Sequence, residues 1–324
     1  MLRTTLLATS FLIAAAVAAP AQSDYPDRPI TIIVPYGAGG PTDTVSRLIA
    51  ESMAKVIGQT LVVENAGGAG STVGAARVAR ADADGYTLML NHVAQASTGS
   101  LYRKLAFDPD ADFDGIGRIT DVPMTVVAKA DLEPTDIAGY LDYVKKNGET
   151  ILYGHAGVGS ASHLCGMLLM DALDVKMTTV GYKGTGPAMT DLLGGRLDTM
   201  CDQTTNTIPN IGSKGIKGYA VTTSARIDAL PDLPTLQEAG LPGFEMTVWH
   251  GLFAPAGTPP EVLEKLSGAL QSALQDPKVI ERFAQLGTTP VAIEEATPAA
   301  MDAHLAAEIT KWQPIIEAAG QFAD

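Results

Sequence analysis

Residues 30–43 read ITIIVPYGAGGPTD, and this stretch says most about the architecture of the chain. Ile30 to Val34 is a short β-branched run that predicts a buried strand, and it leads directly into a glycine-rich turn. Residues 44–57 then place their apolar side chains on one face, which predicts an amphipathic helix. A strand, a glycine-rich turn and a helix in this order indicate an α/β fold.

The same unit recurs along the chain. Residues 64–72 read ENAGGAGST, residues 152–163 read LYGHAGVGSASH, and residues 182–187 read YKGTGP before a helical segment at 188–193. Glycines let the backbone approach a ligand closely, and the N–H groups of a helix start attract negative charge. Each turn alone could be no more than a tight connection, but four of them favour an anion-binding site without a cationic side chain.

Other strand-like and helical runs continue the alternation. We expect strands at 61–64, 86–90, 125–129, 151–153 and 219–223, and helices at 261–274 and at 298–319, the latter bent at Pro314. No linker of biased composition separates the halves, so we expect two α/β lobes between which the chain crosses near 121–124 and near 244–249. This divides the chain into lobe 1, residues 22–122 plus 249–324, and lobe 2, residues 123–248.

Composition and the first residues narrow the function. The chain has 324 residues, enough for about two domains, and a formal charge of -14, which disfavours nucleic acid and anionic membrane surfaces as partners. Residues 1–21 read as a signal peptide, with Arg3, a short apolar run and a small-x-small site that predicts cleavage after Ala21. We therefore expect an exported, periplasmic protein.

Signatures of nucleotide sites, serine hydrolases and metal sites are missing from the sequence, so we expect no cofactor and no metal. His163 opens a helix and could donate to a bound carboxylate, or simply be satisfied there. The run DQTTN at 202–206 could contact a polar ligand or cap the next helix. For Cys165 and Cys201 we expect two buried thiols rather than a disulfide, although export would permit one.

Several motifs resemble a known family. They are the stretch at 30–43, VENAGGAG at 63–70, LYRKL at 101–105, YKG at 182–184 with DLLGG at 191–195, GLPGF at 240–244 and WHGLFAPAGTP at 249–259. In this order and spacing they resemble the receptors of tripartite tricarboxylate transporters, often called the Bug family, from about Tyr25 to the C-terminus.

The resemblance implies a two-lobed periplasmic-binding-protein fold, type II-like, in which each lobe is a mostly parallel sheet flanked by helices and the ligand lies in the interlobe cleft. It also implies the ligand-binding residues. In lobe 1 these are Tyr36, Gly37, Ala38, Gly39, Gly40, Thr42 and Asp43. In lobe 2 they are Gly157, Gly159, Ser160, Ser162, His163, Gly184, Thr185 and Asp202. Asn91 is a further candidate, and Thr204, Thr205, Asn206 and His92 could tune the middle of the cleft. Asn91 and His92 stand where the family has small residues, and Cys201 where it more often has an aromatic one.

The expected function is capture of an organic acid anion for the membrane permease subunits of such a transporter, by a monomer. Because glycine-rich helix starts occur in both halves, we expect a dicarboxylate, aliphatic or aromatic such as terephthalate. Two alternatives remain. One is a receptor that presents its ligand to a two-component sensor; the other is an exported two-lobed enzyme, for which the sequence offers no nucleophile–base pair.

Overall fold

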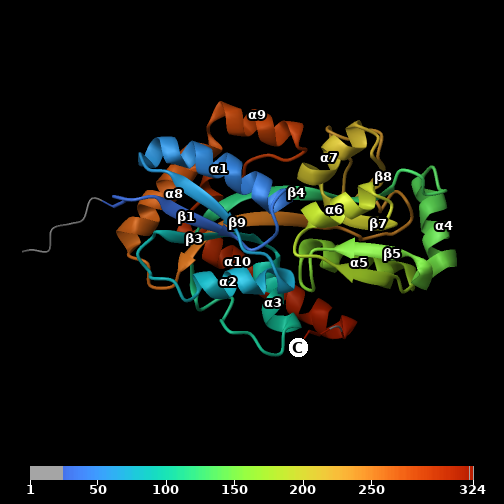
Figure 1. Ribbon diagram of the computed structural model, residues 1–324, viewed down its shortest axis with the longest axis horizontal. Coiled ribbons are helices and arrows are strands. Elements are labelled where there is room, and N and C mark those ends of the chain that lie inside the picture. The colour runs from blue at the N-terminus through green and yellow to red at the C-terminus, as the bar shows by residue number, and fades with distance from the viewer. Residues whose placement is uncertain (1–24, 321, 324) are drawn as a thin grey trace, which may run out of the picture.

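The computed structural model describes residues 25–320, 322 and 323, so the predicted signal peptide lies outside the described residues. Two lobes lie side by side along the long axis of the molecule, and strands β4 and β9 run between them (Figure 1). None of the helices within this part of the chain is both long and apolar enough to cross a bilayer.

The first lobe contains β1 (Ile30–Val34), α1 (Pro41–Ile57), β2 (Leu61–Asn65), α2 (Thr72–Val78), β3 (Thr87–His92) and α3 (Ala94–Leu101). The chain leaves it along β4 (Phe113–Lys129). The second lobe contains α4 (Ile137–Asn147), β5 (Leu152–His155), α5 (Ala161–Leu173), β6 (Thr178–Gly181), α6 (Thr185–Leu193), β7 (Thr199–Gln203), α7 (Thr204–Gly212) and β8 (Ile216–Val221). The chain returns along β9 (Thr247–Pro255) to α8 (Pro260–Leu274), α9 (Pro277–Gln285) and α10 (Pro298–Ala319).

One continuous sheet passes through both lobes in the order β2-β1-β3-β9-β4-β7-β5-β6, and β8 pairs with β4. In the first lobe β1 is parallel to β2 and β3; in the second β5 is parallel to β6 and β7. The predicted α/β class and two lobes are confirmed. The expectation of mostly parallel sheets needs revision, because the central strands β4 and β9 run antiparallel to their neighbours.

Strand β4 passes from one lobe to the other without a break. Its residues up to Pro123 pair with β9, and its residues from Met124 pair with β7. The sequence predicted only residues 125–129 as a strand, and the first half contains two glycines. They are there for packing: a Cβ at Gly117 would lie 2.7 Å from the carbonyl carbon of Ala296, and one at Gly115 would lie 2.8 Å from the Cβ of Met301.

A buried carboxylate ties α10 to the returning strand β9. The indole N–H groups of Trp249 on β9 and Trp312 on α10 both donate to Glu308 Oε2 at 3.0 Å. Lys311 Nζ lies 2.8 Å from the other oxygen. Burial alone would raise the pKa of Glu308, but Lys311 and the two indoles hold it below its usual value.

We expect Glu308→Ala to lower the free energy of unfolding by about 2–4 kcal/mol, because it leaves two buried indole N–H groups without an acceptor. Urea denaturation measures the loss. Glu317→Ala, an exposed position on the same helix, is the control and should change stability very little. Equal effects of the two changes would show that the indole–carboxylate cluster contributes nothing.

Candidate functional site

A small cavity lies between the lobes, at the carboxyl ends of β1, β3, β5 and β7, where ligands bind in open α/β sheets. Its volume is about 20 Å³, room for little more than one water molecule, and it is partly open to solvent. Its lining comes from both lobes: Tyr36, Gly40, Pro41, Thr42, His92, Ala156, Ser160, Ala161, Ser162, Thr185, Asp202 and Gln203.

Four helices begin at this cavity. Pro41 and Thr42 open α1, Ala161 and Ser162 open α5, Thr185 opens α6, and Gln203 is the N-cap of α7. The first N–H groups of a helix have no acceptor within the helix, and its dipole adds partial positive charge there. Among the described residues that line the cavity, none is Lys or Arg. The arrangement can therefore hold an anion through backbone donors alone.

His92 forms one wall of the cavity, stacked on Tyr36 with ring centroids 4.7 Å apart. Its Nδ1 accepts a hydrogen bond from the Ala94 N–H at 3.2 Å, which leaves Nε2 to carry the proton of the neutral ring. Burial, together with the neighbouring His250, holds the pKa of His92 well below its usual value. His92 is thus a neutral donor of one hydrogen bond.

Asp202 is the acidic residue of the lining and is 1% exposed. Burial raises its pKa to about 6, although hydrogen bonds from Asn206, from the Gln203 N–H and from Thr185 oppose the rise. The Asn206 Nδ2 donates to Asp202 Oδ2 at 2.6 Å. Beside it, the buried Oε1 of Gln203 has no hydrogen-bond partner among the described residues.

Eight predicted site residues line the cavity: Tyr36, Gly40, Thr42, His92, Ser160, Ser162, Thr185 and Asp202. Ten others do not: Gly37, Ala38, Gly39, Asp43, Asn91, Gly157, Gly159, His163, Gly184 and Thr204. The sequence missed Pro41, Ala156 and Ala161, and it pointed to Gln203 only as part of the run at 202–206. Pro41, Ala156 and Ala161 adjoin predicted residues. They would have been predicted if residues that contribute only backbone atoms to the cavity had been included.

Three of the predicted side chains that do not line the cavity stabilise the loops instead. Asp43 accepts a hydrogen bond from the Gly39 N–H and pairs with Arg47, and these contacts outweigh burial to keep its pKa low. Asn91 donates to Gln95. For His163 the sequence left open donation to a carboxylate or a satisfied position at the helix start, and its Nδ1 accepts a hydrogen bond from the Gly159 N–H at 3.4 Å.

The predicted glycines that do not line the cavity lie where the lobes touch. We call this contact the seam: loops 37–40 and 67–70 of the first lobe against loops 157–159 and 183–186 of the second. The Gly37 N–H donates to the Lys183 carbonyl at 2.7 Å, and the Tyr102 hydroxyl donates to the Val158 carbonyl at 3.0 Å. A Cβ at Gly70 would lie 1.6 Å from the Val158 oxygen. Glycine is therefore required for the lobes to approach this closely.

Cys165 and Cys201 form a disulfide, so the expectation of two free thiols was wrong. Helix α5 packs directly on β7, which brings two buried residues 36 positions apart to a Cα–Cα distance of 6.1 Å.

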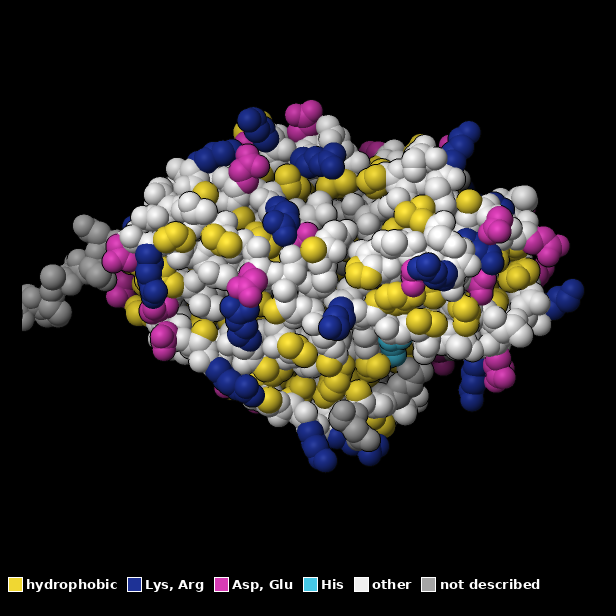
Figure 2. Space-filling model, viewed as in Figure 1, with side chains coloured by type: hydrophobic (Ala, Val, Ile, Leu, Met, Phe, Trp, Pro, Cys, Tyr) yellow, Lys and Arg dark blue, Asp and Glu magenta, His cyan; other side chains and the backbone are white. Residues whose placement is uncertain are grey.

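Through residues 25–320, 322 and 323, no three His, Cys, Asp or Glu side chains gather as a metal site. On the face in Figure 2, positive and negative side chains are interspersed rather than gathered by sign.

The histidines predict how stability depends on pH. Burial and the neighbouring His155 lower the pKa of His163 to about 4 from 6.5. Between these values the unfolded chain binds a proton that the folded chain does not, so stability falls as the pH falls. For His163 alone the loss between pH 7.5 and pH 5 is about 2 kcal/mol. Urea denaturation at several pH values should show a shallower dependence for His163→Asn, and parallel curves would contradict the assignment.

Comparisons with known proteins agree with this geometry. Residues 45–321 match the model of the tripartite tricarboxylate transporter family receptor. A UPF0065 protein from Agrobacterium vitis, described by its place in the TAR-I ttuE-ttuC' intergenic region, is 55% identical over 303 residues, or 94% of this chain and 88% of the relative.

Solved structures give the same picture. The periplasmic binding protein BugD is 48% identical with a TM-score of 0.91, over 93% of this chain and all of that one. MatC from Rhodopseudomonas palustris, solved with bound malate, is 39% identical with a TM-score of 0.87, over 90% of this chain and all of that one. The family and these neighbours are solute-binding proteins, so the alternative of an exported enzyme is dropped. The chain belongs to the tripartite tricarboxylate transporter receptor family, the Bug proteins, and is a periplasmic solute-binding receptor.

Proposed function

We propose that this receptor captures a dicarboxylate in the cavity between its lobes and delivers it to the membrane subunits of a tripartite permease. The observation that carries the proposal is the convergence of four helix N-termini on a cavity whose described lining contains no Lys or Arg. In this proposal residues 1–21 are removed on export, cleavage follows Ala21, and the receptor acts as a monomer in the periplasm.

The distribution of the helix starts favours a ligand with two anionic ends. Helix α1 presents its N-terminus from the first lobe, and α5, α6 and α7 present theirs from the second. A carboxylate at each end of the ligand satisfies donors on both sides, whereas a monocarboxylate leaves one side to water. The bound malate of MatC, a relative with the same fold, supports this class.

Closure of the lobes would complete the capture. We propose that the lobes, residues 22–122 plus 249–324 and residues 123–248, rotate about the two crossings of the chain. The seam then forms only in the closed state, in which the ligand contacts both lobes. A ligand that interacts with both lobes shifts the equilibrium toward closure by its differential affinity for the closed state.

We expect diacids to bind at least tenfold more tightly than monoacids of matched size. Isothermal calorimetry should compare succinate and malate with butyrate, adipate with hexanoate, and terephthalate with benzoate. The two-ended model predicts the difference because each lobe contributes donors to one carboxylate. Equal affinities within any pair that binds would contradict it.

The seam gives a second prediction with a matched control. Gly70→Ala places a methyl group on the Val158 oxygen across the seam, so it should block closure and weaken diacid binding by at least a hundredfold. Gly39→Ala is the matched control. Gly39 has a φ of +80° and Gly70 a φ of +60°, so both substitutions strain the backbone, but no heavy atom lies within 4 Å of a Cβ at Gly39. Gly39→Ala should therefore bind diacid far better than Gly70→Ala; similar affinities would show that closure does not depend on the seam.

A further inference from the structure

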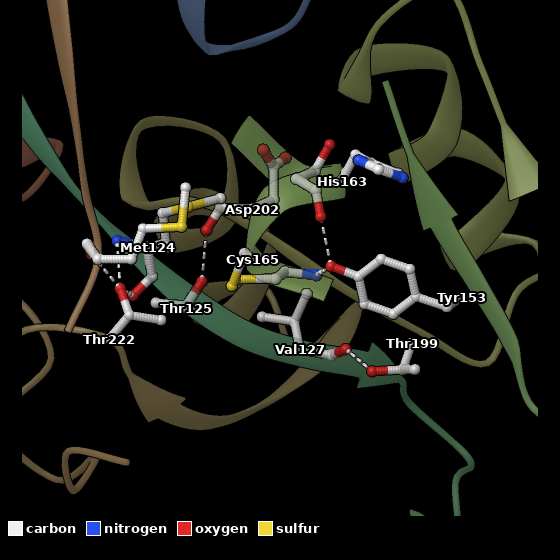
Figure 3. Close-up of a disulfide and its surroundings, with 12 residues drawn as sticks. Met124, Thr125, Val127, Tyr153, His163, Cys165, Thr199, Asp202 and Thr222 are labelled. Carbon is white, nitrogen blue, oxygen red and sulfur yellow. Dashed lines mark hydrogen bonds between the residues drawn. A yellow bond between two sulfur atoms is a disulfide. The ribbon is translucent and has the colours of Figure 1, made fainter. Parts of the chain in front are cut away.

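The disulfide joins the two elements that supply most of the second lobe's half of the cavity. Cys165 follows Ser162 by three residues on α5, and Cys201 directly precedes Asp202 on β7. Both cysteines are fully buried, in the interior behind the cavity lining. In Figure 3 the side chains of Asp202 and His163 lie on the same side of the disulfide.

Tyr153 makes a second, non-covalent link between the same two elements. Its hydroxyl donates to the Ser162 carbonyl at 2.7 Å and accepts from the Cys201 N–H at 3.1 Å (Figure 3). The ring comes from β5 and is 1% exposed. Helix α5 rests directly on it, since a Cβ at Gly166 would lie 2.4 Å from a ring carbon.

These links matter because the cavity needs α5 and β7 in a fixed relative position. Ala161 and Ser162 at the start of α5 and the cap residue Gln203 all line the cavity, and a shift of one element past the other would separate them. The backbone hydrogen bonds of a helix form within the helix itself. Side-chain contacts and covalent links therefore fix its position on a sheet.

We propose that the Cys165–Cys201 disulfide and the Tyr153 hydroxyl form a brace that preorganises the second lobe's carboxylate site before the ligand arrives. The proposal rests on the proposed function, because it assigns a positioning role within that site. A preformed half-site avoids the entropy cost of ordering α5 and β7 on binding, which appears as higher affinity. Because both sulfur atoms belong to fully buried residues, the brace is a permanent part of the site.

The test compares wild type, the double variant Cys165→Ala/Cys201→Ala and Tyr153→Phe in the same calorimetric titration with malate, or with the diacid that wild type binds most tightly. We expect the double variant to bind at least tenfold more weakly and Tyr153→Phe severalfold more weakly. Val144→Ala, in the buried face of α4 and away from the cavity, is the control: it should lower the melting temperature and leave affinity unchanged. If both brace variants bind within twofold of wild type, the brace is only a stabilising crosslink and the proposal is overturned.

A second measurement makes the proposal independent of ligand identity. Hydrogen exchange of the ligand-free proteins should show faster exchange at 156–163 and 202–206 in the brace variants, and not in Val144→Ala. Unchanged exchange at these segments in Tyr153→Phe overturns the proposal even if the double variant does not fold. Absence of binding by wild type would instead count against the proposed function, so the two failures are distinguishable.

Discussion

Backbone-to-backbone contact between the lobes is the constraint on which the rest of this structure depends. An anion site made of N–H groups requires the main chain itself to approach the ligand from both sides, because a backbone donor has no side chain to extend. The loops that bring the helix starts together must therefore touch each other. At Gly67, Gly70, Gly157 and Gly184 a Cβ would lie within 3 Å of backbone atoms of the opposite lobe. The glycine-rich turns thus serve closure as much as ligand contact.

The two crossings of the chain complement this contact on the other side of the cavity. Strands β4 and β9 pair with each other over Phe113 to Pro123, which makes the connection a two-stranded ribbon rather than a pair of loose linkers. Glu308 then fixes α10 to β9 through Trp249. A stiff connection of this kind restricts relative motion of the lobes to few directions. In the proposed closure, it would favour a movement that ends with the loops in register across the seam.

The sequence predicted the strand–turn–helix units well because their signals are local. Glycine-rich turns marked the loops, and the resemblance to the receptor family then implied Tyr36, Ser160 and Thr185, which line the cavity. Orientation at a strand–helix junction was not predictable: Gln203 lines the cavity, whereas Thr204 lies toward Gly287. The disulfide was missed because it depends on α5 lying over β7, a tertiary contact with no local signal.

The charge of the molecule bears on how such a site selects its ligand. A formal charge of -14 repels a dianion at a distance, yet ions screen this repulsion over about 8 Å at physiological ionic strength. Inside the cavity the short-range dipoles of the helix starts act instead. A cavity lysine would bind any anion strongly from one lobe alone, with no need for closure. Where the described lining offers no cationic side chain and its helix starts are divided between two lobes, a ligand gains the most free energy by reaching both. In the proposed function, selection for the distance between two carboxylates would therefore follow from holding them without a cation.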